Sequence, residues 1–230
     1  MFIISERWKN AYPNADVCML VVRGVENVLE HPALEERKRA LEADLRRRFA
    51  NPEDTKADSI IKAYTAYYKR FEKTCHVAGQ LKTTVVKQRP LPTVSGLVDV
   101  MFMAEMNNLL LTAGHDLASV LAPVTLDAAA GNETYVKMNQ QEQVCKAADM
   151  LTFDGDGILS SVIHGPDYRS RISLQSREAL YVTYAPKGIT REQLLAHVRY
   201  MWESILLFAP SAQVEPVSLL TAGGVEEVVL

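Results

Sequence analysis

The sequence predicts an α+β fold, because segments with helical periodicity come first, strand-like segments occupy the middle and a helix follows them. Three observations carry this prediction: an amphipathic stripe that begins at Leu34, an apolar segment that begins at Leu97, and a series of short apolar segments between residues 134 and 184. The chain has 230 residues, of which 48% are hydrophobic and 23% are charged. That composition is typical of a globular protein with enough residues for one large core.

The first strand is expected over residues 16–25, an apolar run rich in valine. A helix follows from Pro32, since a residue without an N–H suits the first helical turn. Spacings of seven and four residues give this helix one apolar stripe, formed by Leu34, Leu41, Leu45 and Phe49. A second amphipathic helix is expected through about Lys73. Its aromatic side chains are predicted to lie in the core rather than to stack on bases: Tyr64, Tyr67, Tyr68 and Phe71.

A third helix is expected from Leu97 to Ala113. It is apolar on nearly every face, which is typical of a helix in the centre of a protein. Gly114 is expected to end this helix in a left-handed conformation.

Strands are then expected in four segments, which are residues 134–138, 151–153, 158–163 and 179–184. The sequence Asp-Gly-Asp-Gly at residues 154–157 indicates the tight turn of a hairpin. A capping box formed by Thr190 and Gln193 begins the last helix, which ends before Pro210. An apolar tail over residues 214–230 is either an edge strand or an interface segment.

We expect a single structural unit with three segments. Residues 1–84 form an N-terminal strand and helical segment, residues 85–210 form a pocket-bearing core, and residues 211–230 form the apolar tail. The three cysteines have no C-x-x-C spacing, so reduced and mostly buried thiols are expected. No signal peptide or membrane span is evident, and we expect a cytoplasmic protein with no membrane partner, metal or cofactor.

The charge balance argues against a constitutive, non-specific RNA-binding protein. The chain has 25 Lys and Arg residues and 28 Asp and Glu residues, a formal net charge of -3. Local basic patches remain as candidates for nucleic-acid contacts: Arg46, Arg47, Arg48, Lys69 and Arg70. These side chains either contact phosphates or form solvated helix faces.

Glu105 and His115 are the candidate catalytic residues. A carboxyl group inside an apolar helix either pairs with a cation or has a raised pKa in a pocket. His115 follows the same helix. It either transfers protons or donates a hydrogen bond to a ligand, or it has the structural role of binding the backbone carbonyls at the end of the helix. Another histidine, His197, is expected on the exposed side of the last helix. Arg169 and Arg171 alternate, which predicts that they project from one face of a strand and either hold an anion together or lie on the surface.

Three segments taken in order resemble the B3/4 domain of the phenylalanyl-tRNA synthetase β subunit. They are LPTVSGLVDV at residues 91–100, AGHDL at residues 113–117 and DYRSRIS at residues 167–173. The resemblance covers most of the chain and is more specific over residues 85–208. This domain also occurs as free-standing bacterial proteins, and in the synthetase it hydrolyses tyrosine mischarged onto the phenylalanine tRNA. The resemblance implies a central β-sheet sandwich flanked by helices, an amino-acid-sized pocket and a tRNA-linked role.

The resemblance also implies a set of pocket residues: Asp99, Met101, Phe102, Ala113, Gly114, Asp116, Arg169, Arg171 and Ser173. Met101 and Phe102 stand where the family motif has a small polar residue and an Asn. Ala113 stands where the synthetase has a His, and Glu105 stands where free-standing members often have a Ser. The pocket is therefore expected to be remodelled, with Glu105 and His115 as its new polar groups.

Three functions follow as hypotheses. The first is a free-standing tRNA-editing-like protein that binds or hydrolyses an aminoacyl-tRNA, with Glu105 or His115 acting on a water molecule. The second is a pocket protein for a free amino acid or related small metabolite, without nucleic acid. The third is a degenerate domain that makes protein–protein contacts, with the apolar tail as the interface of a homodimer.

Overall fold

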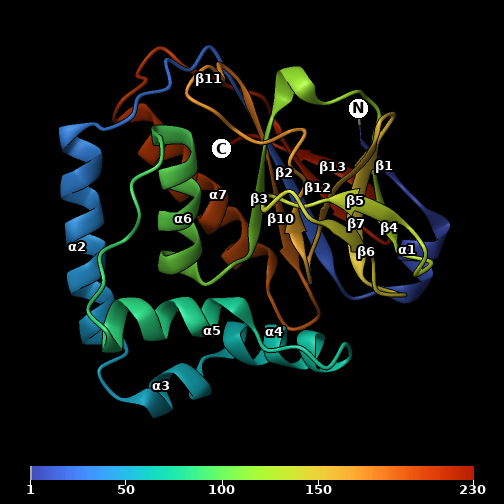
Figure 1. Cartoon of the computed structure of the whole chain (residues 1–230), viewed down its shortest axis with the longest axis horizontal. Helices are drawn as coiled ribbons and strands as arrows, with labels where there is room; N and C mark the ends of the chain where they lie inside the picture. Colours follow the sequence, from blue (N-terminus) through green and yellow to red (C-terminus); the bar gives the residue numbers. More distant parts are fainter. Residues whose placement is uncertain (1) are drawn as a thin grey trace.

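The computed structural model describes residues 2–230 and confirms the α+β class. Helices lie on one side of two face-to-face β-sheets, and a further group of helices lies at one end of the sheets (Figure 1). One sheet is therefore packed between the helical layer and the other sheet.

The first sheet is antiparallel and contains the C-terminal strands of the chain. The strand order is β13 (Gly224–Val228), β12 (Val217–Thr221), β2 (Asp16–Arg23), β10 (Ala179–Ala185) and β3 (Thr112–Asp116), with β11 (Gln213–Val214) also paired to β2. The strands predicted at residues 16–25 and 179–184 are confirmed as β2 and β10. The predicted tail contributes β11, β12 and β13, and β13 is an edge strand.

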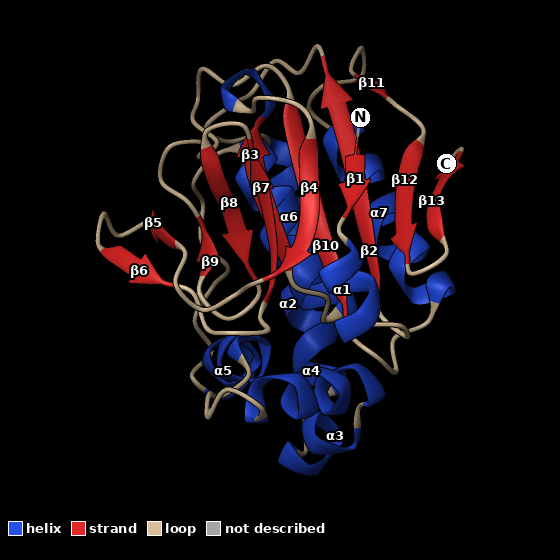
Figure 2. Ribbon diagram, turned by 90° about the vertical axis from the view of Figure 1, so that its right-hand side faces the viewer, coloured by secondary structure: helices blue, strands red, loops and turns tan. Residues whose placement is uncertain are grey.

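The second sheet has one parallel pair and a tight hairpin. Its order is β1 (Phe2–Ile4), β4 (Val124–Ala128), β7 (Met150–Asp154), β8 (Gly157–Ser161) and β9 (Gly165–Pro166), with β1 parallel to β4. The predicted hairpin is confirmed, because Asp154 pairs with Gly157. Asp154 accepts hydrogen bonds from the N–H groups of Asp156 and Gly157, and Gly157 has a φ of 133° that a glycine adopts readily. A separate hairpin, β5 (Thr134–Val136) with β6 (Glu142–Val144), stands apart from both sheets (Figure 2).

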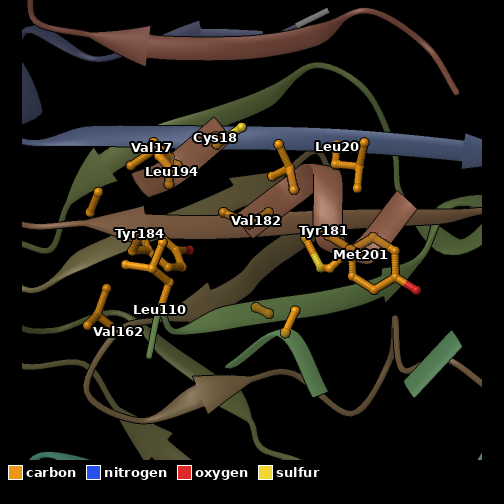
Figure 3. Packing of buried hydrophobic residues seen from close by; sticks show 14 of the residues in the cluster. Val17, Cys18, Leu20, Leu110, Val162, Tyr181, Val182, Tyr184, Leu194 and Met201 are labelled. Carbon is orange, nitrogen blue, oxygen red and sulfur yellow. The ribbon is translucent and has the colours of Figure 1, made fainter. Parts of the chain in front are cut away.

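Two helices cover the first sheet. They are α6 (Gly96–Asn108) and α7 (Arg191–Leu206), and α2 (Pro32–Arg48) packs against α6 from outside. Pro32 occupies the first turn of α2, and the capping box at Thr190 and Gln193 is present as predicted. Leu20 of β2, Tyr181 of β10 and Met201 of α7 are buried together between sheet and helix (Figure 3).

The helices at the end of the sandwich are shorter than expected. They are α3 (Pro52–Ala57), α4 (Ser59–Lys69) and α5 (His76–Leu81), followed by a π-helical turn, η1 (Lys82–Val86). The single helix predicted up to Lys73 is wrong, because Asp58 ends α3 and its carboxylate caps the N–H groups of Ile60 and Ile61 to begin α4. The core position predicted for the aromatic side chains of this segment is confirmed.

The third predicted helix is too long. α6 ends at Asn108, and Leu109 adopts the left-handed conformation with a φ of 61°. Gly114 is not the cap but lies in β3, where Thr112–Asp116 pair with β10. The segment from Leu110 to His115 is mostly apolar and is buried or partly buried, so periodicity alone does not separate a buried strand from a continuing helix.

Several short elements were missed, including β1, β4 and α5, and two more of the missed elements are single turns. α1 (Glu6–Ala11) is a single capped turn, and η2 (Leu117–Ser119) is a single 3₁₀ turn, both too short to show periodicity. Cys18, Cys75 and Cys145 are buried and unpaired, as expected. No helix in the part of the chain that the structure describes is both long and apolar enough to span a bilayer.

Candidate functional site

A cavity of about 400 Å³ lies where β3 of one sheet approaches β9 of the other. α5 and α6 close it from the helical side (Figure 1). Its volume is within the range of pockets that bind small ligands. The cavity therefore has space for an amino-acid-sized group.

The cavity wall is mainly apolar. α6 contributes Val98, Met101 and Phe102, and further apolar side chains come from Met138, Val162 and Ile172. Gly114 of β3 also lines the cavity, and a Cβ atom at this position would lie 3.0 Å from Ile172 Cδ1 and 3.1 Å from Met101 Sδ. The absence of a side chain at Gly114 therefore keeps this part of the cavity open.

Glu105 is the buried ionisable group of this wall. Its side chain comes from α6 and lines the cavity, and its Oε1 accepts a hydrogen bond from the backbone N–H of Thr112 at 2.9 Å. No Lys or Arg of residues 2–230 forms a salt bridge with it, and burial raises its pKa to about 8. Of the two alternatives expected for this carboxyl group, the structure favours the pocket with a raised pKa over the cation partner.

A buried network supports the backbone that binds Glu105. The Thr112 hydroxyl lies 2.7 Å from Nε2 of His197 and 3.0 Å from the hydroxyl of Thr183. The expectation that His197 is exposed is wrong: its side chain is fully buried, and burial lowers its pKa to about 3. His197 faces β3 through its contact with Thr112, whereas the exposed face of α7 carries Ala196, Arg199 and Glu203.

Polar groups of two other segments line the same cavity. His76 and Gln80 come from α5, and Arg171 comes from the segment before β10. Arg171 donates to the backbone carbonyl of Tyr168 at 2.8 Å and stacks over the ring of Tyr168 at 3.8 Å. The guanidinium is thus held in place while its residue remains exposed.

His115 lies apart from this cavity. Residues alternate along β3, so that Thr112 and Gly114 face α6 while His115 faces the interior between the sheets. His115 is fully buried, and its Nδ1 lies 2.7 Å from the Ser170 hydroxyl and 3.6 Å from Asp167 Oδ1. Although burial opposes it, hydrogen bonds from His115 and Ser170 lower the pKa of Asp167. Glu105 and His115 are therefore not brought together.

Two more predicted pocket residues stabilise local structure instead. Asp99 is buried against Lys38, with 2.7 Å between Oδ2 and Nζ, and it accepts the N–H of Val94 at 2.8 Å. Asp116 accepts the N–H of Ala118 and the hydroxyl of Ser176. Neither carboxylate lines the cavity.

The remaining predicted residues divide in the same way. Ala113, Gly114, Met101, Phe102 and Arg171 line the cavity, whereas Arg169 and Ser173 do not. Arg169 pairs with Asp154 at 2.9 Å, and the Ser173 hydroxyl accepts the N–H of Gln175. The expected pairing of Arg169 and Arg171 on one strand face is wrong, because this segment forms a turn with only an isolated bridge between Arg171 and His115.

The predicted basic residues lie away from the cavity. Arg46 pairs with Glu42 at 3.5 Å, Arg47 pairs with Asp44 at 2.5 Å, and Arg48 lies 3.5 Å from Asp44. Lys69 and Arg70 lie at the end of α4, and Arg70 stacks over the ring of Tyr12 at 5.1 Å. These cations are thus held by acidic or aromatic neighbours, with Lys69 as the exception.

Sequence reasoning missed Thr112, His76 and Gln80. Thr112 lies within the predicted third helix, so its role depended on the strand β3. The segment with His76 and Gln80 shows too little periodicity to be recognised as a helix. Among residues 2–230, no three His, Cys, Asp or Glu side chains gather in a way that could hold a metal ion.

Comparison with known proteins identifies a similar fold and no close relative. No protein-family model and no curated protein sequence matches the chain. The fold is similar to that of an N-terminal fragment of the phenylalanyl-tRNA synthetase β subunit from Pyrococcus horikoshii. The TM-score is 0.56 and the sequence identity is 11%; the match covers 100% of this chain and 54% of that fragment. The chain therefore spans about half the length of the fragment, and the likeness establishes the fold.

Proposed function

We propose that this chain is a domain of the B3/4 type that binds the aminoacyl end of an aminoacyl-tRNA and hydrolyses its ester bond. The amino-acid moiety occupies the cavity beside α6, and its side chain packs against Met101 and Phe102. The observation that carries the proposal is the buried Glu105 carboxyl group, which lines this cavity without a cationic partner. The fold similarity to a synthetase β-subunit fragment supports the link to tRNA.

Glu105 is suited to general-base chemistry. A general base works best when its pKa is close to the working pH, since it must be both ionised and basic enough to take a proton. With a pKa of about 8, about one tenth of the carboxyl groups are ionised at neutral pH, and that fraction rises steeply above it. The hydrogen bond from Thr112 N–H to Oε1 leaves Oε2 to meet a water molecule.

The reaction consumes one water molecule and needs no redox partner. The Glu105 carboxylate takes a proton as the water oxygen bonds to the ester carbonyl carbon. The bond from that carbon to the ribose oxygen then breaks, and the ribose oxygen receives a proton. The products are the free amino acid and the uncharged tRNA.

Deacylation of a panel of correctly charged and mischarged tRNAs tests the proposal. The wild-type protein is expected to hydrolyse at least one ester above the uncatalysed rate, and Glu105→Gln to reduce that rate by about 10²- to 10⁴-fold. Glu6→Gln, an exposed carboxylate of α1 remote in sequence from the site, is the matched control and keeps the wild-type rate. Equal rates for wild-type and Glu105→Gln would contradict the proposed role of Glu105.

A second candidate is a protein that binds a free amino acid without nucleic acid. The pairing of Arg46, Arg47 and Arg48 with acidic residues of α2 favours it, because these cations are less available to phosphates. Calorimetric titration with free amino acids separates the two functions. Tight binding of a free amino acid, together with no binding of tRNA at low salt, would favour the second candidate.

A further inference from the structure

Three lysines gather beside the cavity without acidic partners. Lys73 follows α4, Lys137 lies at the tip of the β5–β6 hairpin, and Lys146 lies between β6 and β7. The lysine salt bridges of residues 2–230 involve other residues: Lys9, Lys38 and Lys56. The three ammonium groups are therefore available to an external anion.

His164 reports that these lysines are close to one another in space. Burial, and then the positive charges of Lys137, Lys73, Lys146 and His76, lower its pKa to about 4. The Nε2 atom of His164 is buried and has no hydrogen-bond partner. Segments far apart in the sequence thus place Lys73, Lys137 and Lys146 around His164, and we call these three lysines the basic rim.

The basic rim adjoins the proposed amino-acid cavity. Lys137 and His164 line a smaller hollow of about 210 Å³ together with Met138 and Pro166. Met138 and Pro166 also line the main cavity, so the two hollows share a wall. A ligand that fills the main cavity and extends past Pro166 would meet the basic rim.

The backbone holds the rim in position relative to the cavity. Tyr168 N–H donates to the Val136 carbonyl at 2.9 Å, and the Tyr135 hydroxyl donates to the Gly165 carbonyl at 2.7 Å. On the other side, the Tyr68 hydroxyl donates to the Val162 carbonyl at 2.9 Å and lies 3.2 Å from Nδ1 of His76. The hairpin and the α4–α5 connection are both tied to the segment around β9 that lines the cavity (Figure 2).

Two carboxyl groups near the rim, Asp149 and Glu133, are already engaged. Asp149 accepts hydrogen bonds from the hydroxyls of Tyr67 and Ser161, and burial raises its pKa to about 6. Glu133 accepts backbone N–H groups of its own turn. These carboxyls satisfy internal donors instead of neutralising the lysines.

We infer that the basic rim binds the sugar–phosphate backbone next to the aminoacylated end of the RNA, in place of the arginines of α2. This inference rests on the proposed function, because it takes the amino-acid moiety to be in the main cavity. Charge complementarity carries the argument: Lys137 lines the hollow that shares a wall with the cavity, the unpaired Lys73 and Lys146 act on the same His164, and a phosphodiester chain is the anionic part of that substrate.

Fluorescence anisotropy with uncharged tRNA tests the rim. The variant Lys73→Gln/Lys137→Gln/Lys146→Gln is expected to bind at least about ten-fold more weakly than wild-type at low salt, and the slope of log K against log salt should fall by about 2. The matched control Arg46→Gln/Arg47→Gln/Arg48→Gln removes the same charge from α2 and should change the affinity by less than about three-fold. Circular dichroism establishes that each variant is folded.

A second substrate separates this inference from the proposed function. An aminoacyl ester of adenosine carries no phosphate, so the lysine variant should hydrolyse it at the wild-type rate while losing kcat/KM for aminoacyl-tRNA. Glu105→Gln should lose activity on both substrates. Equal weakening of tRNA binding by the lysine and arginine variants, or none by the lysine variant, would overturn the inference and leave the proposed function intact. No tRNA binding and no ester hydrolysis by wild-type protein would overturn both.

Discussion

Glu105 and Thr112 meet across the turn that joins α6 to β3, where the Glu105 carboxyl accepts the backbone N–H of Thr112 at 2.9 Å. The left-handed conformation of Leu109 reverses the chain and brings these two residues together. A buried carboxyl group is thereby held at the cavity wall by a neutral donor rather than by a cation. Because no cation stabilises its ionised form, its pKa stays raised.

The first prediction concerns stability against pH. The Glu105 carboxyl has an ordinary pKa of 4.5, and burial raises its pKa to about 8 in the folded protein. Between these values the folded state binds more protons than the unfolded state, so the free energy of unfolding falls as pH rises through this range. The Glu105 contribution is on the order of a few kcal/mol. Asp149, whose pKa burial raises to about 6, acts in the same direction.

Urea unfolding of wild-type and Glu105→Gln at pH 5 and pH 8 measures this contribution. Gln resembles the protonated carboxyl group, so the variant should lose less stability than wild-type between the two pH values. The comparison isolates Glu105, because Asp149 is present in both proteins. The same pH dependence in both would show that Glu105 ionises with an ordinary pKa.

The second prediction concerns the buried pair between Lys38 and Asp99, whose side chains are 3% and 1% exposed. Lys38→Met leaves the Asp99 carboxylate buried without its cation and should lower the free energy of unfolding by about 3–5 kcal/mol. Lys9→Met, which removes an exposed pair with Glu6, should cost less than about 1 kcal/mol. Chemical denaturation measures both, and similar losses for the two variants would contradict the structural role assigned to Asp99.

The third prediction concerns the shape of the cavity. Gly114→Val places methyl groups against Ile172 and Met101, where even a Cβ atom is close. The variant should lose about 1–3 kcal/mol of stability and should bind the amino-acid moiety at least about ten-fold more weakly. Titration with the best substrate or a non-hydrolysable analogue measures the affinity. Unchanged affinity would place the ligand elsewhere.

The fourth prediction separates His115 from catalysis. His115→Ala removes a buried ring bonded to Ser170 and should lower the free energy of unfolding by about 2–4 kcal/mol. Under conditions where the variant stays folded, its deacylation rate should equal that of wild-type, and Glu105→Gln/His115→Ala should match Glu105→Gln. A lower deacylation rate for the double variant than for Glu105→Gln would show that His115 takes part in the reaction.

The class of fold and many of its elements could be predicted from local signals. Pro32, the Thr190–Gln193 capping box and the Asp154–Gly157 turn each involve contacts within a few residues, and all are present. The ends of α6 and α4 could not be predicted in this way. The chain leaves α6 at Leu109 because β10 offers a partner for Thr112–Asp116, and that partner lies about seventy residues away in the sequence.

The candidate site was predictable to a similar extent. Glu105 is unusual within an apolar helix, Met101 and Phe102 depart from the family motif that the segment resembles, and all three line the cavity. Asp99 is also unusual, but its partner Lys38 lies on α2, and sequence alone does not pair them. The sequence likewise did not show which residues lie on each face of β3. Thr112, which binds Glu105, lies on one face, and His115 lies on the other. The side on which a residue lies depends on register, and a shift of one residue exchanges the two faces.

The position of β2 also constrains the order in which the molecule can form. β2 lies between β10 and β12, and Met19 pairs with both Val182 and Ser218. A growing chain therefore carries an apolar strand with no neighbours through most of its synthesis, and closes the sheet only after residues 217–221 have emerged. The first sheet is thus expected to fold slowly, with β2 as the segment that most needs protection from aggregation until residues 217–221 have emerged.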